Sequence, residues 1–303
     1  MPVLEKIGTA RFLCMYLRHC VIDEEKLIMQ FDFGVIEIAS RLLVGGAIGF
    51  CIGLTGVGGG ILMLPALTLL FGMDPVTAVG TASFYSFLTK ASATWHHVKL
   101  KTIEWKIALR FLVGAVPANI GIALWITSHG SDEPFNQNLK GFIAGVICFS
   151  LLVMFVNSLI QRTGPALRIG EHTLTHFLAN HPVLLHGLNI VIGAFVGSLI
   201  GATSIGGGVL IIPALIIVFG LSASRTVGTS IFIAVVLTMI TAVIYGGSKA
   251  MDVPTVIVST LGSLITVYYG SKLAVRLPDR VLKGIVLGLM LATALLMVAD
   301  AMH

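Results

Sequence analysis

Charged residues are scarce in this chain: Asp, Glu, Lys and Arg make up 11% of its 303 residues, whereas hydrophobic residues make up 56%. A water-soluble domain carries roughly 25% charged residues because its surface faces water. The few charges also cluster and leave apolar stretches of about 20 residues, which can cross a hydrocarbon core of ~30 Å as helices. The composition therefore excludes an ordinary soluble domain and predicts an integral membrane protein.

Cysteines and enzyme motifs are also sparse. The four cysteines, Cys14, Cys20, Cys51 and Cys148, form no CxxC pair, which argues against a disulfide framework or a metal site. The sequence contains no HExxH and no GxSxG motif, and its glycine runs lack the GK[ST] ending of a phosphate-binding loop. We therefore expect no cofactor, no metal and no catalytic residue, and we expect any transport to be driven by gradients rather than by ATP.

The net charge of +5 does not indicate a nucleic-acid partner. The basic residues sit in short loops between apolar runs, as the positive-inside bias of membrane proteins requires. The first residues mix acidic with basic side chains and contain no apolar stretch that ends in a cleavage site, so we expect no signal peptide. We interpret residues 1–33 as a polar N-terminal tail.

Apolar runs fill most of the remaining chain. Lipid cannot satisfy the backbone groups of open β-structure, and the runs lack the alternating pattern of barrel strands. The sequence therefore predicts an all-α polytopic membrane protein. The runs lie at 34–54, 61–72, 76–95, 104–127, 138–160, 183–204, 205–221, 224–247, 252–274 and 281–300.

The sequence repeats at an interval of 148 residues: 45–84 and 193–232 align without a gap and share 18 identities in 40 positions. Apolar composition alone does not place Thr, three glycines, Pro and Phe-Gly in register, so we infer an internal duplication. It predicts two homologous halves of four to five transmembrane segments each. Their bounds are 34–160 for the first transmembrane repeat, 161–182 for a central loop and 183–303 for the second transmembrane repeat.

Two topologies are compatible with this repeat. If residues 34–72 cross the membrane once, each half crosses four times and the halves are parallel, but the basic segment 272–283 then lies outside. If 34–54 and 61–72 count separately, the halves are inverted and the N-terminal tail lies outside instead. As a single helix, 34–72 would be ~58 Å long, about twice the membrane core. It must break or bend, and we favour the inverted arrangement.

Each repeat contains three consecutive glycines followed by a new apolar run, with Pro65 or Pro213 in its first turns, where a missing N–H is best tolerated. Glycine disfavours a helix by ~1 kcal/mol per residue relative to Ala, so the triplets predict helix breaks in mid-membrane. The N-terminus of a half-helix offers N–H groups and positive partial charge to an anion. The candidate substrate-binding residues are Thr55, Gly58, Gly59, Gly60, Thr203, Ser204, Gly206, Gly207 and Gly208.

Helix packing is an alternative explanation for small residues in these segments. Glycines recur at every fourth position before each triplet, a pattern that lets two backbones approach closely. We favour packing for these six, Gly45, Gly49, Gly53, Gly193, Gly197 and Gly201. A Val-Gly-Thr motif opens the next long run in each repeat and brings in the hydroxyls of Thr81, Ser83, Thr229 and Ser230. They either line a substrate cavity or bond back to a carbonyl four residues earlier.

Charged residues within the apolar runs are candidates for a functional role. Lys90 could neutralise an anion, but Lys99 is close, so we favour a side chain that extends to the interface. Glu37 and Arg41 are four residues apart and can pair along one helix, which we interpret as structural.

The segments GLTGVGGGILMLPAL and GATSIGGGVLIIPAL, with the Val-Gly-Thr motifs that follow, resemble the TauE/SafE sulfite exporter family, also called the toluene-sulfonate uptake permeases. The resemblance covers about 34–300, and Ser204 departs from it where the first copy has Gly56. It implies a duplicated permease of the bacterial inner membrane that moves sulfite, sulfoacetate, other organosulfonates or thiosulfate. By position it places the substrate region at 55–60 and 203–208.

Residues and resemblance together predict a secondary transporter of small sulfur-containing anions, bound between the two repeats at half-helix N-termini and driven by protons or the membrane potential. Its expected partners are a small anionic substrate and the lipid bilayer; coupling protons and further copies in a homo-oligomer are additional candidates. A channel for small solutes is the alternative. A membrane enzyme is a third hypothesis, with Glu37 and Arg41 as its only close charged pair.

Overall fold

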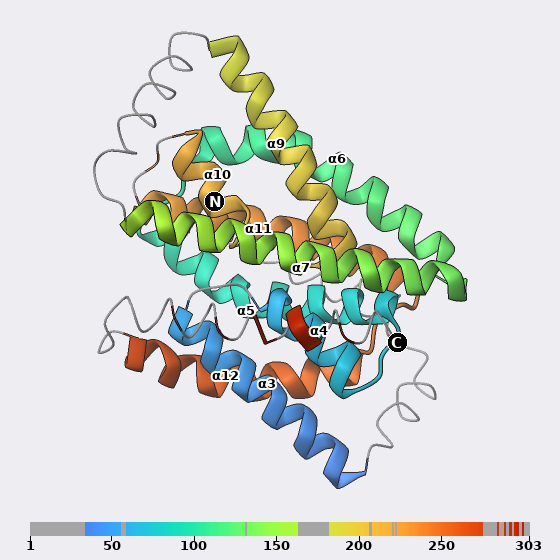
Figure 1. Ribbon diagram of the computed structural model, residues 1–303. Helices are drawn as coiled ribbons and strands as arrows, with labels where there is room; N and C mark the ends of the chain where they lie inside the picture. The colour runs from blue at the N-terminus through green and yellow to red at the C-terminus, as the bar shows by residue number, and fades with distance from the viewer. Residues whose placement is uncertain are drawn as a thin grey trace, which may run out of the picture.

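The computed structural model describes residues 34–162 and 182–274, apart from short gaps at 56–58, 131, 206–207, 220 and 222, and scattered residues between 284 and 299. All regular secondary structure in this described part is α-helical (Figure 1). The helices are α3 Val35–Thr55, α4 Gly60–Leu70, α5 Pro75–Lys99, α6 Trp105–His129, α7 Glu133–Arg162, α9 Pro182–Thr203, α10 Ile211–Ile217, α11 Ala223–Gly247 and α12 Val253–Ala274.

Five stretches within these helices are long and apolar enough to cross a membrane: Val35–Leu54, Trp105–His129, Glu133–Val153, Arg225–Gly247 and Val253–Gly270. Shorter apolar helical stretches lie at Gly60–Leu70 and Gly187–Thr203. The predicted fold class, an all-α polytopic membrane protein, is confirmed at this level.

The second short helix differs from the expectation. The apolar run 205–221 predicted a half-helix that begins at the second glycine triplet, but α10 starts at Ile211, and residues 208–210 form a turn before it. Its seven residues end at Ile217, and Val218 and Phe219 form another turn. The sequence has glycines near both ends of this run, at 206–208 and at 220, and glycine disfavours helical backbone.

Helix bounds in the second half of the chain follow those of the first half at the interval of the sequence repeat. α3 ends at Thr55 and α9 at Thr203; α5 and α11 cover 75–99 and 223–247; α6 and α12 begin at Trp105 and Val253.

Two helix pairs form the outer layers of the molecule, with α4, α5 and α11 between them (Figure 1). α3 lies along α12 in one pair, and α6 lies along α9 in the other. A Cβ placed on Gly45 would lie 2.2 Å from the Ser259 carbonyl oxygen, and one on Gly49 would lie 2.5 Å from the Ser263 Cα, so α3 and α12 run parallel.

The other pair has the same construction. A Cβ on Gly193 would lie 2.3 Å from the Phe111 carbonyl oxygen, and one on Gly197 the same distance from the Ala115 carbonyl oxygen. Such approaches are possible only without a side chain. The packing interpretation is confirmed for these glycines of the two stripes.

α5 and α11 cross each other antiparallel in the centre. A Cβ on Gly80, near the start of α5, would lie 2.1 Å from the Ala250 carbonyl oxygen, just beyond the end of α11. A Cβ on Gly228, near the start of α11, would lie 2.4 Å from the hydroxyl of Thr102, just beyond the end of α5.

Candidate functional site

The first glycine triplet leads into α4. Gly59 precedes this helix, and its carbonyl accepts hydrogen bonds from the N–H groups of Leu62 (3.3 Å) and Met63 (2.8 Å). Gly60 is the first helical residue, both glycines are buried, and Gly59 at the N-cap position has no side chain that could cap this N-terminus. The positive end of an 11-residue helix therefore lies inside the protein.

α9 ends at Thr203 and is followed by Ser204 in a left-handed conformation with φ of 57°. This backbone is uncommon for a residue other than glycine, and the equivalent position of the first repeat is Gly56. The Thr203 hydroxyl donates to the Leu199 carbonyl (2.7 Å) and accepts from the Ile205 N–H (3.2 Å). The Ser204 hydroxyl is buried, and within the described residues it has no hydrogen-bond partner.

The start of α4 and the end of α9 are in contact. A Cβ on Gly60 would lie 2.2 Å from the Ser204 carbonyl oxygen and 3.1 Å from its hydroxyl oxygen. On the other side, a Cβ on Gly59 would lie 2.8 Å from the ring of Tyr85, a fully buried residue whose hydroxyl donates to the Gly45 carbonyl (3.4 Å). The N-terminus of α4 is thus held between α9 and α5, where only glycine fits.

The threonines of the two Val-Gly-Thr motifs make equivalent contacts across the molecule. The Thr81 hydroxyl oxygen accepts a hydrogen bond from the Asp252 N–H (3.0 Å), and the Thr229 hydroxyl oxygen accepts one from the Glu104 N–H (3.0 Å). Asp252 and Glu104 directly precede α12 and α6. The motifs alone predict neither partner, although both acidic residues also recur at the repeat interval of 148. A role for these threonines in substrate binding stays a prediction.

The two serines of these motifs differ from each other. Ser230 donates to the Val227 carbonyl (2.9 Å) within its own helix. Ser83 is fully buried in α5, and its hydroxyl has no hydrogen-bond partner in the described part of the chain. Of these two serines, Ser83 is therefore the one whose buried donor is available to another molecule among the described contacts.

Other predicted site residues lie outside the described residues. These are Gly58, Gly206, Gly207 and the side chain of Thr55, so the helix break at each triplet stays a prediction. Gly208 lies in the turn before α10. Pro65 and Pro213 are buried inside α4 and α10, as the sixth and third helical residues.

Two ion pairs occupy the ends of helices. Arg41 pairs with Glu37 at 3.2 Å, as predicted from their spacing, and its guanidinium also lies over the Phe71 ring. Arg225 pairs with Glu104 and so links the start of α11 to the residue before α6.

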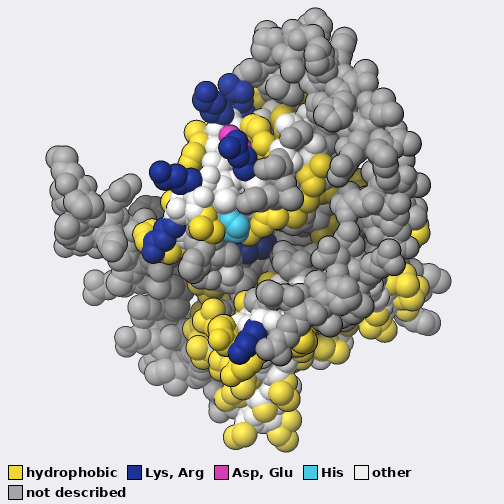
Figure 2. Space-filling model, turned by 90° about the vertical axis from the view of Figure 1, so that its left-hand side faces the viewer, with side chains coloured by type: hydrophobic (Ala, Val, Ile, Leu, Met, Phe, Trp, Pro, Cys, Tyr) yellow, Lys and Arg dark blue, Asp and Glu magenta, His cyan; other side chains and the backbone are white. Residues whose placement is uncertain are grey.

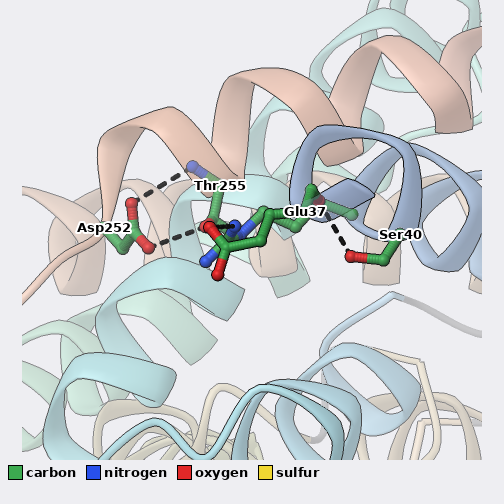
Figure 3. Close-up of polar contacts among 5 residues, drawn as sticks. Glu37, Ser40, Asp252 and Thr255 are labelled. Carbon is green, nitrogen blue, oxygen red and sulfur yellow. Dashed lines mark hydrogen bonds and ion pairs between the residues drawn. The ribbon is translucent and has the colours of Figure 1, made fainter. Parts of the chain in front are cut away.

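Asp252 directly precedes α12, close to the start of α3. Its carboxylate accepts hydrogen bonds from the Thr255 hydroxyl (2.7 Å) and the Thr255 N–H (3.2 Å). Figure 3 shows this pair beside Glu37, whose backbone carbonyl accepts from the Ser40 hydroxyl (2.8 Å). Polar contacts therefore lie at the starts of both α3 and α12.

The expectation that Lys90 extends to the interface is wrong: its side chain is buried, with 9% exposed. α5 continues to Lys99, which places the helix end ~14 Å beyond Lys90 at 1.5 Å per residue. Lys99 is exposed and lies over the Trp95 ring.

The described side chains do not meet the requirements of a metal site. Among the residues that the structure describes, no group of three or more His, Cys, Asp or Glu side chains could hold a metal ion.

Five helical stretches of membrane-spanning length define an integral membrane protein that crosses the bilayer several times. The family model of the sulfite exporter TauE/SafE matches residues 41–297, and the chain belongs to this family. The resemblance noted from the glycine motifs is thereby confirmed.

Relatives carry the names of membrane transporters. "Probable membrane transporter protein YjnA" of Bacillus subtilis (strain 168) is 31% identical over 261 residues, which cover 84% of this chain and 98% of the relative. "Probable membrane transporter protein YunE" of the same organism is 30% identical over 203 residues, covering 63% and 70%. A "Probable membrane transporter protein" of Xylella fastidiosa (strain 9a5c) is 27% identical over 235 residues, covering 77% and 83%. No solved structure matches the chain.

Proposed function

We propose that the protein is a secondary transporter of small sulfur-containing anions, such as sulfite, sulfoacetate or another organosulfonate. We place the bound anion where the start of α4 meets the end of α9. The family supports the class of transporter. The observation that carries the site is the contact between Gly60 and Ser204, which sets an uncapped helix N-terminus against a buried hydroxyl that has no partner among the described residues.

The chemistry of this contact suits an oxyanion. Sulfite and sulfonate oxygens accept hydrogen bonds, and the N–H groups of a first helical turn and a serine hydroxyl donate them. The helix end adds positive partial charge. Gly59 and Gly60 place no side chain over the N–H groups of this buried helix end, and backbone without side chains is the kind that a small anion can approach closely. The seven-residue α10 offers no comparable helix end.

A transporter needs its substrate between parts that can move against each other. We propose that 34–160 and 183–303 are two repeats of inverted topology joined by 161–182. The recurrence of helix bounds supports this, as does the equivalence of the α3–α12 and α9–α6 pairs. The antiparallel crossing of α5 and α11 supports inversion, because an axis that relates antiparallel membrane helices lies in the membrane plane.

Alternating access follows from that arrangement. Gly60 belongs to the first repeat and Ser204 to the second, so an anion bound beside their contact would touch both. Rocking of one repeat against the other would expose it first to one side of the membrane and then to the other. Either protons or the membrane potential would drive the cycle, because no phosphate-binding loop is present to use ATP.

Charge supports one orientation in the membrane. The described charged residues where α5 and α12 end and α6 and α11 begin are mostly basic, whereas acidic residues gather at the other end. By the positive-inside rule, we propose that the basic end faces the cytoplasm. The basic end carries Lys99, Lys101, Lys106, Arg110, Arg225 and Lys272, with Glu104; the other end carries Glu37, Asp74, Asp132, Glu133 and Asp252, with Arg41, Lys140 and Lys249.

We propose transport rather than catalysis. The Glu37–Arg41 pair, the candidate for a membrane enzyme, lies in the first turns of α3, and the Glu37 side chain is 58% exposed. Each partner is engaged by the other, as in an ordinary structural ion pair.

Counterflow in proteoliposomes tests the proposal. Vesicles loaded with unlabelled sulfite should take up radiolabelled sulfite faster than empty vesicles, with a rate that saturates as the external concentration rises. Uptake that does not saturate and shows no acceleration by internal sulfite would indicate a channel. Absence of flux for sulfite, sulfoacetate and thiosulfate alike would contradict the substrate class.

A further inference from the structure

We infer that Ser83, Ser86 and Lys90 form an anion-binding face on α5, on which the Lys90 ammonium compensates the charge of a small oxyanion within the membrane. The inference rests on the proposed anion transport. It extends the site from the α4–α9 contact to a cationic side chain, which that contact lacks.

The three residues share one side of α5. Steps of three and four residues along an α-helix return to the same face, and Ser83, Ser86 and Lys90 are spaced in this way. Both serines are fully buried, and Lys90 is 9% exposed. Neither serine hydroxyl has a hydrogen-bond partner in the described part of the chain. Two available donors and a cation thus lie in one row.

Lys90 has no acidic partner among the described residues: the ion pairs found there join Arg41 to Glu37 and Arg225 to Glu104. A buried charge without a counter-charge is costly, and inside a membrane it marks a functional position more often than a structural one. A mobile anion would supply the missing negative charge each time it passes.

The second repeat shows that the fold does not need these groups. α11 is the equivalent of α5, and the equivalents of Ser83, Ser86 and Lys90 at an interval of 148 are Ile231, Ala234 and Thr238. The Thr238 hydroxyl donates to the Ala234 carbonyl (2.7 Å) and is therefore satisfied within its own helix. One repeat carries a cation and two available hydroxyls where the other carries two apolar residues and an internally bonded threonine, as expected for a site that binds one ion.

The position of Lys90 suits a substrate path. Because α5 and α11 cross antiparallel, with Gly80 against Tyr245 and Thr102 against Gly228, Lys90 lies near the middle of the crossing, ~15 Å along α5 from Gly80. Ser86 directly follows Tyr85, whose ring contacts Gly59 at the start of α4.

A basic surface lies beyond this row. α5 runs from Lys90 toward the exposed Lys99, Lys101, Lys106 and Arg225, and Figure 2 shows Lys and Arg side chains gathered on the face of the molecule seen there. Positive charge around an entrance raises the local concentration of anions. The surface would therefore concentrate anions at the end of the helix that carries the buried row.

Uptake of radiolabelled sulfite by proteoliposomes tests the role of Lys90 through three variants. Lys90→Met removes the charge, Lys90→Arg keeps it, and Thr238→Val changes the equivalent position of the other repeat. We expect Lys90→Met to raise the KM for sulfite at least ~10-fold, as for the loss of a charge-assisted hydrogen bond. Lys90→Arg should retain most of the affinity, and Thr238→Val should transport like the wild type.

Each alternative outcome is informative. A folded Lys90→Met protein with the wild-type KM would overturn the inference while leaving the proposed function intact. If Lys90→Met does not fold, the Ser83→Ala/Ser86→Ala double variant takes its place, and an unchanged KM there would also overturn the inference.

If the wild type transports no sulfur anion, the proposed function fails separately. The anion-binding face is then tested by the unfolding temperature measured with chloride, nitrate or phosphate. A rise in the unfolding temperature of the wild type that is lost in Lys90→Met supports the anion-binding face. No change in the unfolding temperature with any of these anions overturns it.

Discussion

Replacing Gly60 with alanine adds one methyl group at the point where the end of α9 meets the start of α4. The new Cβ would lie 2.2 Å from the Ser204 carbonyl oxygen, whereas close carbon–oxygen contacts measure about 3.3 Å. The two backbones must therefore separate by roughly 1 Å. Overpacking of this kind costs about 1–3 kcal/mol, and the shift moves the helix N-terminus away from the hydroxyl with which it is proposed to bind the anion.

The assay compares sulfite uptake and thermal unfolding of Gly60→Ala with those of Gly145→Ala. Gly145 lies in α7, and a Cβ there meets no atom within 4 Å, so this control makes the same chemical change without a clash. We expect uptake by Gly60→Ala to fall at least ~10-fold, the factor that corresponds to 1.4 kcal/mol. Uptake by the control should not change. Wild-type uptake by a folded Gly60→Ala protein would refute the placement of the site.

Three further changes have definite expected results. Ser204→Gly removes the buried hydroxyl but tolerates the positive φ, and it should raise the KM for sulfite while leaving the unfolding temperature near that of the wild type; an unchanged KM would exclude the hydroxyl from binding. Gly197→Ala, with its Cβ 2.3 Å from the Ala115 carbonyl oxygen, should lower the unfolding temperature, and Gly187→Ala, which meets no atom within 4 Å, should not. Thr229→Val leaves the Glu104 N–H without its acceptor and should destabilise the protein by about 1–3 kcal/mol, measured by thermal unfolding; equal stability would mean that water replaces the threonine.

The helices were predictable wherever an apolar run ends in charged or turn-forming residues. The run 104–127 became α6 at 105–129, and the run 224–247 became α11 at 223–247. Among the runs that the structure describes, the exception is 205–221, where α10 covers only 211–217; the run 281–300 lies mostly outside the described residues. Hydropathy does not show where glycines shorten a helix inside an apolar run, because glycine is compatible with lipid but disfavours a helix.

The packing of helices was not predictable to the same degree. A repeat identifies which segments are equivalent, but not that α3 lies along α12 and α6 along α9. The stripes of glycine predicted close helix contacts without naming the partner helix. For the same reason, the contact between Gly60 and Ser204 could be expected only as a convergence of two motifs somewhere in the membrane.

Lys90 was misjudged because its distance from other lysines was counted along the sequence rather than along a helix. Burial on a packed face depends on neighbouring helices, which the sequence does not place. The spacing of Ser83, Ser86 and Lys90 was a visible signal, since small hydroxyl residues four and seven positions before an intramembrane lysine share its face.

The central claim, that a sulfur-containing anion binds where α4 meets α9, is tested most directly by thermal unfolding of the purified protein with sulfite, sulfoacetate, thiosulfate, sulfate or acetate. A ligand that binds only the folded state stabilises it by ~2.7 kcal/mol at a hundredfold excess over its Kd. The account predicts selective stabilisation by one sulfur anion in the wild type and its loss in Gly60→Ala. Stabilisation by a cation or an uncharged solute, with no response to any sulfur anion, would contradict it.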